Sequence, residues 1–406
     1  MLTAHLKTQV CRVREFCSAI LLVTGWLLVS SLNVQAQAYD YDPSWYDASA
    51  PYVKIGVNKD GVYAISGANL ASAGVALGQI NPATLRLLEN GIEIPIWFEG
   101  DEAVFDPSDE IHFVGRRNTG EEEGEWAYYA TQTSESNAPN DDIQSSSYHS
   151  LYSATRYYWL TWGGDDGLRY VDSPIAPEPG AQTITSVRQT FHNELNFTYY
   201  QGDSQDSGHP YFTHGEGYHW HTFNQNSIRR DSVIVGTRIG PFTSSPSETV
   251  DFEARIVAGS AAHHNVILKI RMADGGPGVY VPMDEDDWTG YEYRTLTASV
   301  PQNEIFRFNG QVYLEIVSDN QYYDGVTPNK VFTDWFRIST TRHLTLSSRQ
   351  IMFPSRGNGN YAYSVNGWDP GSAIVYDPTT ARRYAGSVNG SGAFVFGDNG
   401  NADGVY

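Results

Sequence analysis

Four histidines and one glutamate lie within a 13-residue stretch, HPYFTHGEGYHWH, at residues 209–221. If the stretch is extended, His219 and His221 lie on the same side of a strand, a spacing that can bind zinc or copper. His214 is the third candidate ligand, and no HExxH motif accompanies the three. Aromatic residues alternate with the histidines, which is typical of a packed loop. We therefore favour a structural role and keep a metal site as the alternative.

Acidic residues offer a second set of candidate ligands, because carboxylate oxygens suit calcium. The stretch 284–287 reads DEDD, and Asp319 is followed by a further aspartate at 324. Near the end of the chain, residues 399–404 fit the first half of a calcium loop, N-x-N-x-D-G, which makes Asp398 and Asp403 weak metal candidates. Polar turns are the commoner explanation of each group, and calcium binding is the alternative. We assign no cofactor, and calcium remains an alternative at these acidic groups.

Patterns for catalysis are missing from the sequence. There is no G-x-S-x-G elbow, no phosphate-binding Walker loop and no dinucleotide-binding glycine motif. Both cysteines, Cys11 and Cys17, precede the apolar run at residues 18–32, so the chain that follows has no thiol nucleophile, disulfide or thiolate metal site. Acidic residues are abundant, but their separation cannot be inferred from sequence. We assign no catalytic residue.

The first 36 residues have the pattern of a secretory signal peptide. Lys7, Arg12 and Arg14 form a basic head, an uncharged apolar run follows, and small residues precede a cleavage site after Ala36. We expect export to the periplasm, the outer-membrane surface or the extracellular space, with no membrane span after cleavage. Because 26 basic residues face 47 acidic ones, for a net charge of −21, the chain is not expected to bind nucleic acid or anionic lipid.

Composition and periodicity predict an all-β protein with minor helix, since aromatic residues make up 13% and there are 38 glycines. An N-terminal β domain is expected at 39–165. It should hold a hairpin at 52–65 turning at Asp60-Gly61, a short helix at 67–74 and a second hairpin at 85–97 turning at Asn90-Gly91. Strands are also expected at 109–114 and 157–162, and an exposed loop at 119–142.

A proline-rich linker at 174–180 precedes a second run of strands. Residues 249–257 alternate apolar and charged side chains, which predicts a strand with one buried face, and 331–338 is apolar on both faces. Several such strands predict a jelly-roll-like β-sandwich at 183–345. Residues 346–406 should begin a further β segment, with strands at 361–365, 373–377 and 392–396. Its last strand, beginning at Val405, is expected to continue beyond Tyr406.

Several segments together resemble the gingipain-type cysteine peptidases, a family that includes the PorU-like sortases of the type IX secretion system. They occur in the family's order and extend over nearly the whole chain after residue 36. The segments are YVKIGVNKDGVYAI at 52–65, LRLLENG at 85–91, DEIHFVG at 109–115, YHSLYSATRYYWLTWG at 148–163, FTDWFRISTTR at 332–342 and YSVNGW…IVYD at 363–377.

The resemblance implies the β-rich, non-catalytic N-terminal part of such a peptidase. In the family, the Cys-His pair belongs to an α/β domain that follows this part, so no catalytic residue carries over. The expected partners are a downstream peptidase domain of the same gene product and components of the secretion system. The leading interpretation is an exported accessory or pro-region that shields or positions the catalytic domain.

Two other interpretations come from the residues themselves. Trp and Tyr on a jelly roll can stack on sugars, so a secreted surface module that binds glycans or mediates adhesion is the main alternative. A free-standing hydrolase using Asp, Glu and the histidine cluster is the third.

Overall fold

The computed structural model describes residues 43–406, except 102, 120–147, 151–152, 201–217, 224–228, 243–244, 274–278, 320–324, 347 and 399–403. The expected signal peptide, both cysteines and most of the loop predicted at 119–142 lie outside the described residues. The chain divides into two compact units, Met1–Tyr46 and Asp47–Tyr406. The first contributes a single described turn of 3-10 helix, η1 (Pro43–Trp45), and the second contains all the other described elements.

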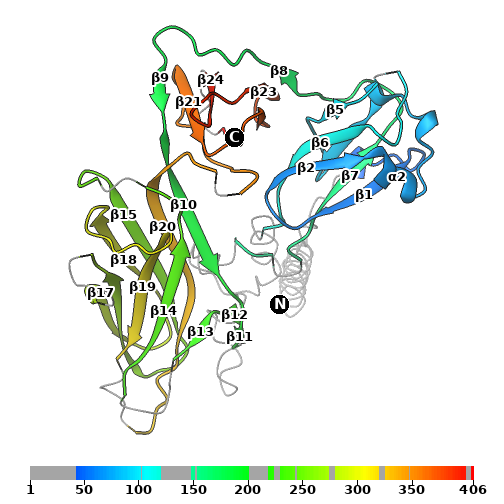
Figure 1. Cartoon of the computed structure of the whole chain (residues 1–406). Coiled ribbons are helices and arrows are strands. Elements are labelled where there is room, and N and C mark those ends of the chain that lie inside the picture. Colours follow the sequence, from blue (N-terminus) through cyan, green and yellow to red (C-terminus); the bar gives the residue numbers. More distant parts are fainter. Residues whose placement is uncertain are drawn as a thin grey trace, which may run out of the picture. The chain divides into compact units, whose positions relative to one another are not determined.

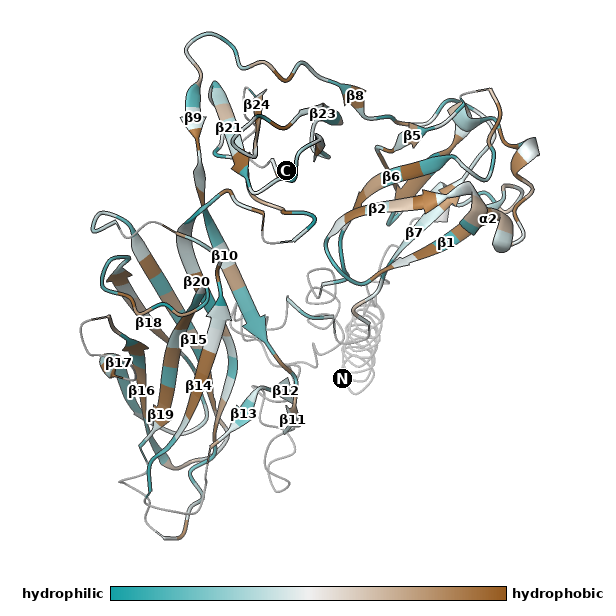
Figure 2. Ribbon diagram, viewed as in Figure 1, coloured by the Kyte–Doolittle hydropathy of each residue, from teal (hydrophilic) through white to brown (hydrophobic). Residues whose placement is uncertain are grey.

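The described residues are rich in strands and hold one α-helix, α2 (Gly67–Ser72), as an all-β fold with minor helix requires (Figure 1). No described helix is long and apolar enough to cross a membrane. Apolar and polar residues alternate along many strands (Figure 2), so that one face of each sheet is buried. Buried apolar residues form three large clusters, one in each of three regions of the chain.

The N-terminal region packs two small sheets around the first cluster. One sheet has the strand order β1-β7-β3-β4 and the other β2-β6-β5. Both contribute to the core, for example through Leu160 of one and Phe113 of the other. The strands are β1 (Tyr52–Val57), β2 (Gly61–Ser66), β3 (Arg86–Glu89), β4 (Ile92–Ile94), β5 (Trp97–Glu99), β6 (Glu110–Gly115) and β7 (Arg156–Thr161).

The hairpin predicted at 52–65 is wrong, although both of its strands form. β1 pairs with β7, whereas β2 pairs with β6 in the other sheet. The turn before Gly61 therefore carries the chain across the sandwich. Each strand has one apolar face, and placing the strands in opposite sheets buries both faces in one core, which direct pairing would not do. Alternation identifies a strand but not its partner.

The second predicted hairpin is confirmed, because β3 pairs directly with β4. Asn90 and Gly91 both have positive φ, 47° and 82°, as a two-residue hairpin turn requires. The helix is confirmed too. The hydroxyl of Ser66 accepts a hydrogen bond from the backbone N–H of Asn69 at its start, and Gly74 follows its end with φ 92°.

The middle region is a jelly roll of eight long antiparallel strands, as predicted. Their order is β10-β20-β15-β18 in one sheet and β14-β19-β16-β17 in the other. Counted one to eight along the chain, this is 1-8-3-6 facing 2-7-4-5, the double Greek key of jelly rolls. The strands are β10 (Ser186–Glu194), β14 (Asp231–Arg238), β15 (Thr249–Ala258), β16 (His263–Arg271), β17 (Tyr280–Thr289), β18 (Tyr293–Pro301), β19 (Gln311–Ser318) and β20 (Val331–His343).

The core of the jelly roll follows the predicted alternation. In β15, Val250, Phe252 and Ala254 are buried between the sheets. β20 is buried on both faces, as predicted. Its inner face belongs to the core between the sheets, and Phe332 on its outer face belongs to a small separate cluster, against which Tyr200 packs. Three two-residue strands lie beside it: β11 (Thr198–Tyr199), β12 (Tyr218–His219) and β13 (His221–Thr222).

The C-terminal region is a small module of two three-stranded sheets, β24-β21-β9 and β22-β23-β8. Four strands come from the end of the chain: β21 (Tyr361–Asn366), β22 (Ser372–Asp377), β23 (Arg382–Ser387) and β24 (Ala393–Asp398). The other two, β8 (Val171–Asp172) and β9 (Gln182–Ile184), flank the predicted linker and pair in parallel with β23 and β21. The module is therefore built from two distant stretches of sequence.

The linker at 174–180 contains no strand, as its composition predicts, but it is packed against the module. The N–H of Gly397 donates to the carbonyl of Ile175 at 3.0 Å, and the Ile175 side chain packs on the module's core. Tyr406 also belongs to this core, and it exchanges two backbone hydrogen bonds of 2.9 Å with Phe353. Continuation of this strand beyond Tyr406 stays a prediction, as do the three domain boundaries.

Candidate functional site

The two described histidines of the cluster lie on separate short strands, not on one. His219 in β12 faces Thr198, whereas His221 in β13 faces Thr333. The His219 ring stacks on Phe332 with centroids 4.8 Å apart and is 2% exposed. Burial lowers the pKa of His219 to about 4, so its imidazole is neutral at pH 7.

His214, with the rest of the cluster before residue 218, lies outside the described residues. Within the described ranges, no group of three His, Cys, Asp or Glu side chains is placed to hold a metal ion. Aromatic packing, which the interleaved rings indicated, is what the structure shows for His219. His221 follows the same pattern, with its ring edge-on to Phe223.

The carboxylate of Asp398 is buried and bonded to protein groups. It accepts hydrogen bonds from the hydroxyls of Tyr384, at 2.9 Å, and Tyr406, and the Arg382 guanidinium lies 3.5 Å away. Burial, followed by the nearby carboxylate, raises the pKa of both tyrosines. Asp398 thus joins the last residue of the chain to β23. Asp403, the other calcium candidate, lies outside the described residues.

The acidic stretch 284–287 lies inside strand β17 and not in a turn. Its carboxylates bond to neighbouring strands: Asp284 accepts from the N–H of Thr297, and Asp287 pairs with His263 at 2.9 Å. These contacts tie β17 to its neighbours, which is a structural role.

A larger hollow, of about 450 Å³, lies between the N-terminal sheets and the C-terminal module. We call it the apolar groove. Val62 of β2 and Val114 of β6 line one side, and Ile374 of β22 lines the other. Val62 and Ile374 are 40% and 36% exposed, so apolar surface of both strands is accessible in the groove. The remaining lining residues are Gly61, His112, Arg349, Gln350, Ile351, Met352, Phe353, Val365, Trp368, Ser372, Val375, Tyr376, Pro378, Val405 and Tyr406.

Gln350 spans this groove. Its side-chain oxygen Oε1 accepts a hydrogen bond of 2.8 Å from the backbone N–H of Val62. The same amide lies so close to Gly61 that a Cβ there would come within 2.6 Å of it. A Cβ at position 61 would therefore require this exposed side-chain amide to shift.

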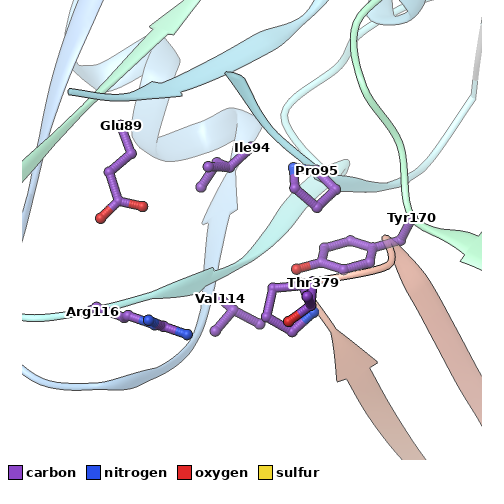
Figure 3. Close-up of a pocket in the computed structure, with 8 residues that line it drawn as sticks. Glu89, Ile94, Pro95, Val114, Arg116, Tyr170 and Thr379 are labelled. Carbon is purple, nitrogen blue, oxygen red and sulfur yellow. The ribbon is translucent and has the colours of Figure 1, made fainter. Parts of the chain in front are cut away.

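A smaller pocket of about 200 Å³ adjoins the groove and shares Val114 and Pro378 with it. Figure 3 shows Glu89 and Arg116 at one end of this pocket and Tyr170 with Thr379 at the other. Glu89 is neutralised by the Arg156 guanidinium at 2.5 Å. Arg116 is exposed and has no ion pair among the described residues, so it brings positive charge to the pocket.

Contacts beside the groove fix its two walls. The Arg383 guanidinium lies over the Trp97 ring, 3.9 Å from its centroid, and pairs with Asp172 at 2.7 Å. The Tyr170 ring packs on Tyr376 with centroids 4.8 Å apart, and burial raises the pKa of both hydroxyls. The walls are therefore linked by aromatic and charged contacts as well as by the β8–β23 pairing.

The lining of the groove is mostly apolar, which suits binding of an apolar ligand. It also includes His112, whose Nε2 lies 3.0 Å from Oε2 of Glu110, and we assign no catalytic residue in it. Sequence reasoning found the strands that line the groove but not the groove itself. The sequence carried only a weak signal for the groove, namely apolar residues such as Val62 and Ile374 on strands that would lie at sheet edges.

Comparison with known proteins gives a fold likeness only. No family model and no curated protein matches the chain. Among solved structures, dimeric latent PorU from Porphyromonas gingivalis superposes with a TM-score of 0.53 at 13% identity, covering 88% of this chain and 32% of that one. The chain thus has a PorU-like β-rich fold and spans about a third of the length of PorU.

Two carbohydrate-related structures also match, with much lower scores. The first is a Clostridium thermocellum xylanase with a carbohydrate-binding module, at a TM-score of 0.23 and 10% identity, covering 45% of this chain and 30% of that one. The second is a carbohydrate-binding module solved with calcium and xylotriose, at 0.19 and 18%, covering 38% and 99%. Superpositions this poor say nothing about the function of this chain.

Proposed function

We propose that this chain is the exported, non-catalytic N-terminal region of a gingipain-type, PorU-like cysteine peptidase, which it shields or positions. One observation carries the proposal: nearly all of the chain, 88%, matches PorU in fold, yet it accounts for only 32% of PorU. The sequence adds a second argument, since no cysteine follows Cys17. A cysteine peptidase of this kind needs its nucleophile in another part of the gene product.

The described structure is compatible with a scaffold. The jelly roll, the N-terminal sheets and the C-terminal module each have their own core. We infer domains at 39–165, 183–345 and 346–406 after a signal peptide at 1–36, with the downstream peptidase domain as first partner and secretion-system components as further ones. Export to the periplasm, the outer-membrane surface or the extracellular space follows from the same proposal.

The size of the native polypeptide tests this proposal. An antiserum raised against residues 47–406 should detect, in fractions of the native cells, a product clearly heavier than the 45.1 kDa of this sequence. The recombinant chain on the same blot gives the reference mass. A native product no heavier than this reference, in cytoplasmic, membrane and culture fractions alike, contradicts an attached peptidase.

A glycan-binding module is the second candidate, and a specific feature favours it. The β11–β12 ribbon exposes three aromatic rings: Phe197 at 73%, Tyr199 at 57% and Tyr218 at 41%. Tyr199 and Tyr218 face each other across the ribbon, with centroids 4.9 Å apart. Exposed rings of this kind can stack on sugars, as the jelly-roll hypothesis anticipated.

A glycan array probed with purified residues 37–406 tests this second candidate. We expect saturable binding that Tyr199→Ala and Tyr218→Ala abolish. Phe308→Ala is the matched control, because Phe308 is also aromatic and 58% exposed but lies in the connection before β19. Absence of binding, or equal loss in all three variants, would remove this candidate.

A further inference from the structure

Two sheet edges meet at the apolar groove. In the described part of the chain, β2 pairs only with β6 and β22 only with β23, so each is an edge strand. Edge strands present backbone N–H and C=O groups that an extended peptide can pair with. The Gln350 amide already makes one such contact, to the N–H of Val62. A peptide that pairs with β2 at Val62 would take the place of this side-chain amide.

The size and lining of the groove suit a short peptide. Its volume of about 450 Å³ lies within the range of ligand pockets. Ile351, Met352 and Val405 add to the apolar walls formed by Val62 and Ile374. Because alternate side chains of a strand point the same way, a peptide paired with an edge would place every second residue against these walls.

Positive charge flanks the groove on a chain that is otherwise acidic. Arg349 lines the groove, and Arg116 lines the adjoining pocket. Both are exposed, and neither has an ion pair among the described residues. With a net charge of −21, most of the surface repels acidic ligands, so these two cations are a local exception. A carboxylate on an occupant would find an opposite charge there.

We propose that the apolar groove docks an extended segment of a separate polypeptide, with apolar residues at alternate positions and an acidic residue at one end. A second copy of this chain is disfavoured as occupant, because each copy has a charge of −21 and like charges repel. The proposal is independent of any attached peptidase, since it rests only on the groove, its edges and its arginines.

Fluorescence anisotropy with labelled probe peptides tests the proposal on the purified chain, residues 37–406. The probe is acetyl-VTVIE-amide. One comparison peptide, acetyl-VTVIK-amide, reverses the charge, and another has N-methyl groups on alternate backbone nitrogens and cannot pair as a strand. We expect saturable binding of the first peptide, and binding at least about tenfold weaker for the other two, a difference that one lost ion pair or hydrogen-bond set can produce.

Charge-reversal variants locate the binding. Arg349→Glu and Arg116→Glu should each lower the affinity for the acidic probe about tenfold. Arg238→Glu is the matched control: the same charge change at an exposed arginine of β14, in the jelly roll, should leave affinity unchanged. All three side chains are on the surface, so we expect the variants to stay folded, and circular dichroism checks this directly.

Four results of the peptide titrations would overturn the proposal, and a fifth comes from the oligomeric state of the free chain. They are no saturation up to about 1 mM peptide, equal binding of the acidic and basic probes, equal binding of the N-methylated probe, or an equal loss in Arg238→Glu. Sedimentation velocity tests whether a second copy of the chain occupies the groove. A concentration-dependent dimer of the free chain that Ile374→Glu abolishes would show that a second copy fills the groove, against the proposal.

Discussion

The jelly roll and the C-terminal module each pack two sheets around a core, but they take their strands from different parts of the chain. The jelly roll takes all eight long strands from one continuous stretch, Ser186–His343, and its core lies between its own two sheets. The module takes four strands from residues 361–398 and completes each sheet with a two- or three-residue strand from residues 171–184. It also buries Tyr406 from beyond its last strand.

The difference separates a self-contained scaffold from a part that depends on distant segments. A large core can be built from one continuous stretch, whereas a domain of about 60 residues buries a smaller fraction of its surface and is only marginally stable alone. The module gains area from the linker and from the N-terminal sheets, and the groove lies at that second contact. The peptide binding that we propose therefore belongs to a different region of the chain from the jelly roll.

The largest expected effect on stability comes from truncating a buried side chain in the core of the jelly roll. Phe336→Ala in the jelly roll should lower the free energy of unfolding by about 3–5 kcal/mol, since the ring is fully buried. Urea unfolding measures the loss, and hydrogen exchange followed by mass spectrometry locates it. Exchange should rise in β14–β19 and stay low in β21–β24. Ile234→Ala, at an exposed position of β14, is the control. Equal acceleration in both regions would mean that they unfold as one.

Lowering the pH should reduce the stability of the jelly roll and leave that of the C-terminal module unchanged. The pKa of His219 is about 4 in the folded chain against 6.5 unfolded, because burial favours the neutral ring. The stabilisation is therefore complete above pH 6.5 and is lost as pH falls toward 4. Between pH 6.5 and 4.5 the loss should be about 2–3 kcal/mol.

Urea unfolding at several pH values, with His219→Phe beside the parent chain, measures this loss. The variant should have a shallower dependence on pH. Burial also lowers the pKa of His192 and His264, so part of the dependence remains. The module has no histidine, since none follows His343. If β21–β24 lose protection before the jelly roll as pH falls, the comparison fails.

Removing one carboxylate should loosen the module alone. Asp398→Ala leaves the buried hydroxyls of Tyr384 and Tyr406 without their acceptor, at a cost of about 1–3 kcal/mol. Hydrogen exchange should rise in β21–β24 and at the 405–406 end. Asp369→Ala, at an exposed aspartate of the same module, should change nothing. Matching behaviour of the two variants would show that Asp398 is dispensable.

The smallest expected effect is that of disturbing the contact between the linker at 174–180 and the C-terminal module. A Cβ at Gly397 would lie 2.5 Å from the Cα of Pro177, a backbone atom that cannot move aside easily. Gly397→Ala should therefore displace residues 174–180 and cost about 1–2 kcal/mol. Faster exchange confined to 174–180 and β24 is the expected signature. Gly390→Ala has open space around it and is the control. An unchanged linker would contradict its role in the module.

Sequence alone predicted the strands of the N-terminal region, some of those of the jelly roll and three of the four at the end of the chain, because those depend on local alternation. It failed where partners are distant. The pattern at 52–65 has a strong turn signal at Asp60-Gly61, yet its two strands join different sheets. β8 and β9 were missed because strands of two or three residues have no period, and only the pairing with β23 and β21 reveals them.

Site prediction was limited for the same reason. His219 and His221 have a metal-like spacing, but the chain bends between them and pairs each with a different strand. The apolar groove depends on Val62 and Ile374, which are 312 positions apart, and no motif marks either. A cavity between distant segments has no sequence pattern of its own.

Thiol labelling of the native polypeptide tests the central claim most directly, that these residues bind and position while the chemistry belongs to another part of the product. After signal removal, residues 37–406 contain no cysteine. The account predicts that a cysteine-peptidase activity probe labels the native product captured by an antiserum to residues 47–406, and does not label the recombinant chain. Proteolysis by the recombinant chain itself, or a native product that takes up no thiol label after denaturation, would contradict it.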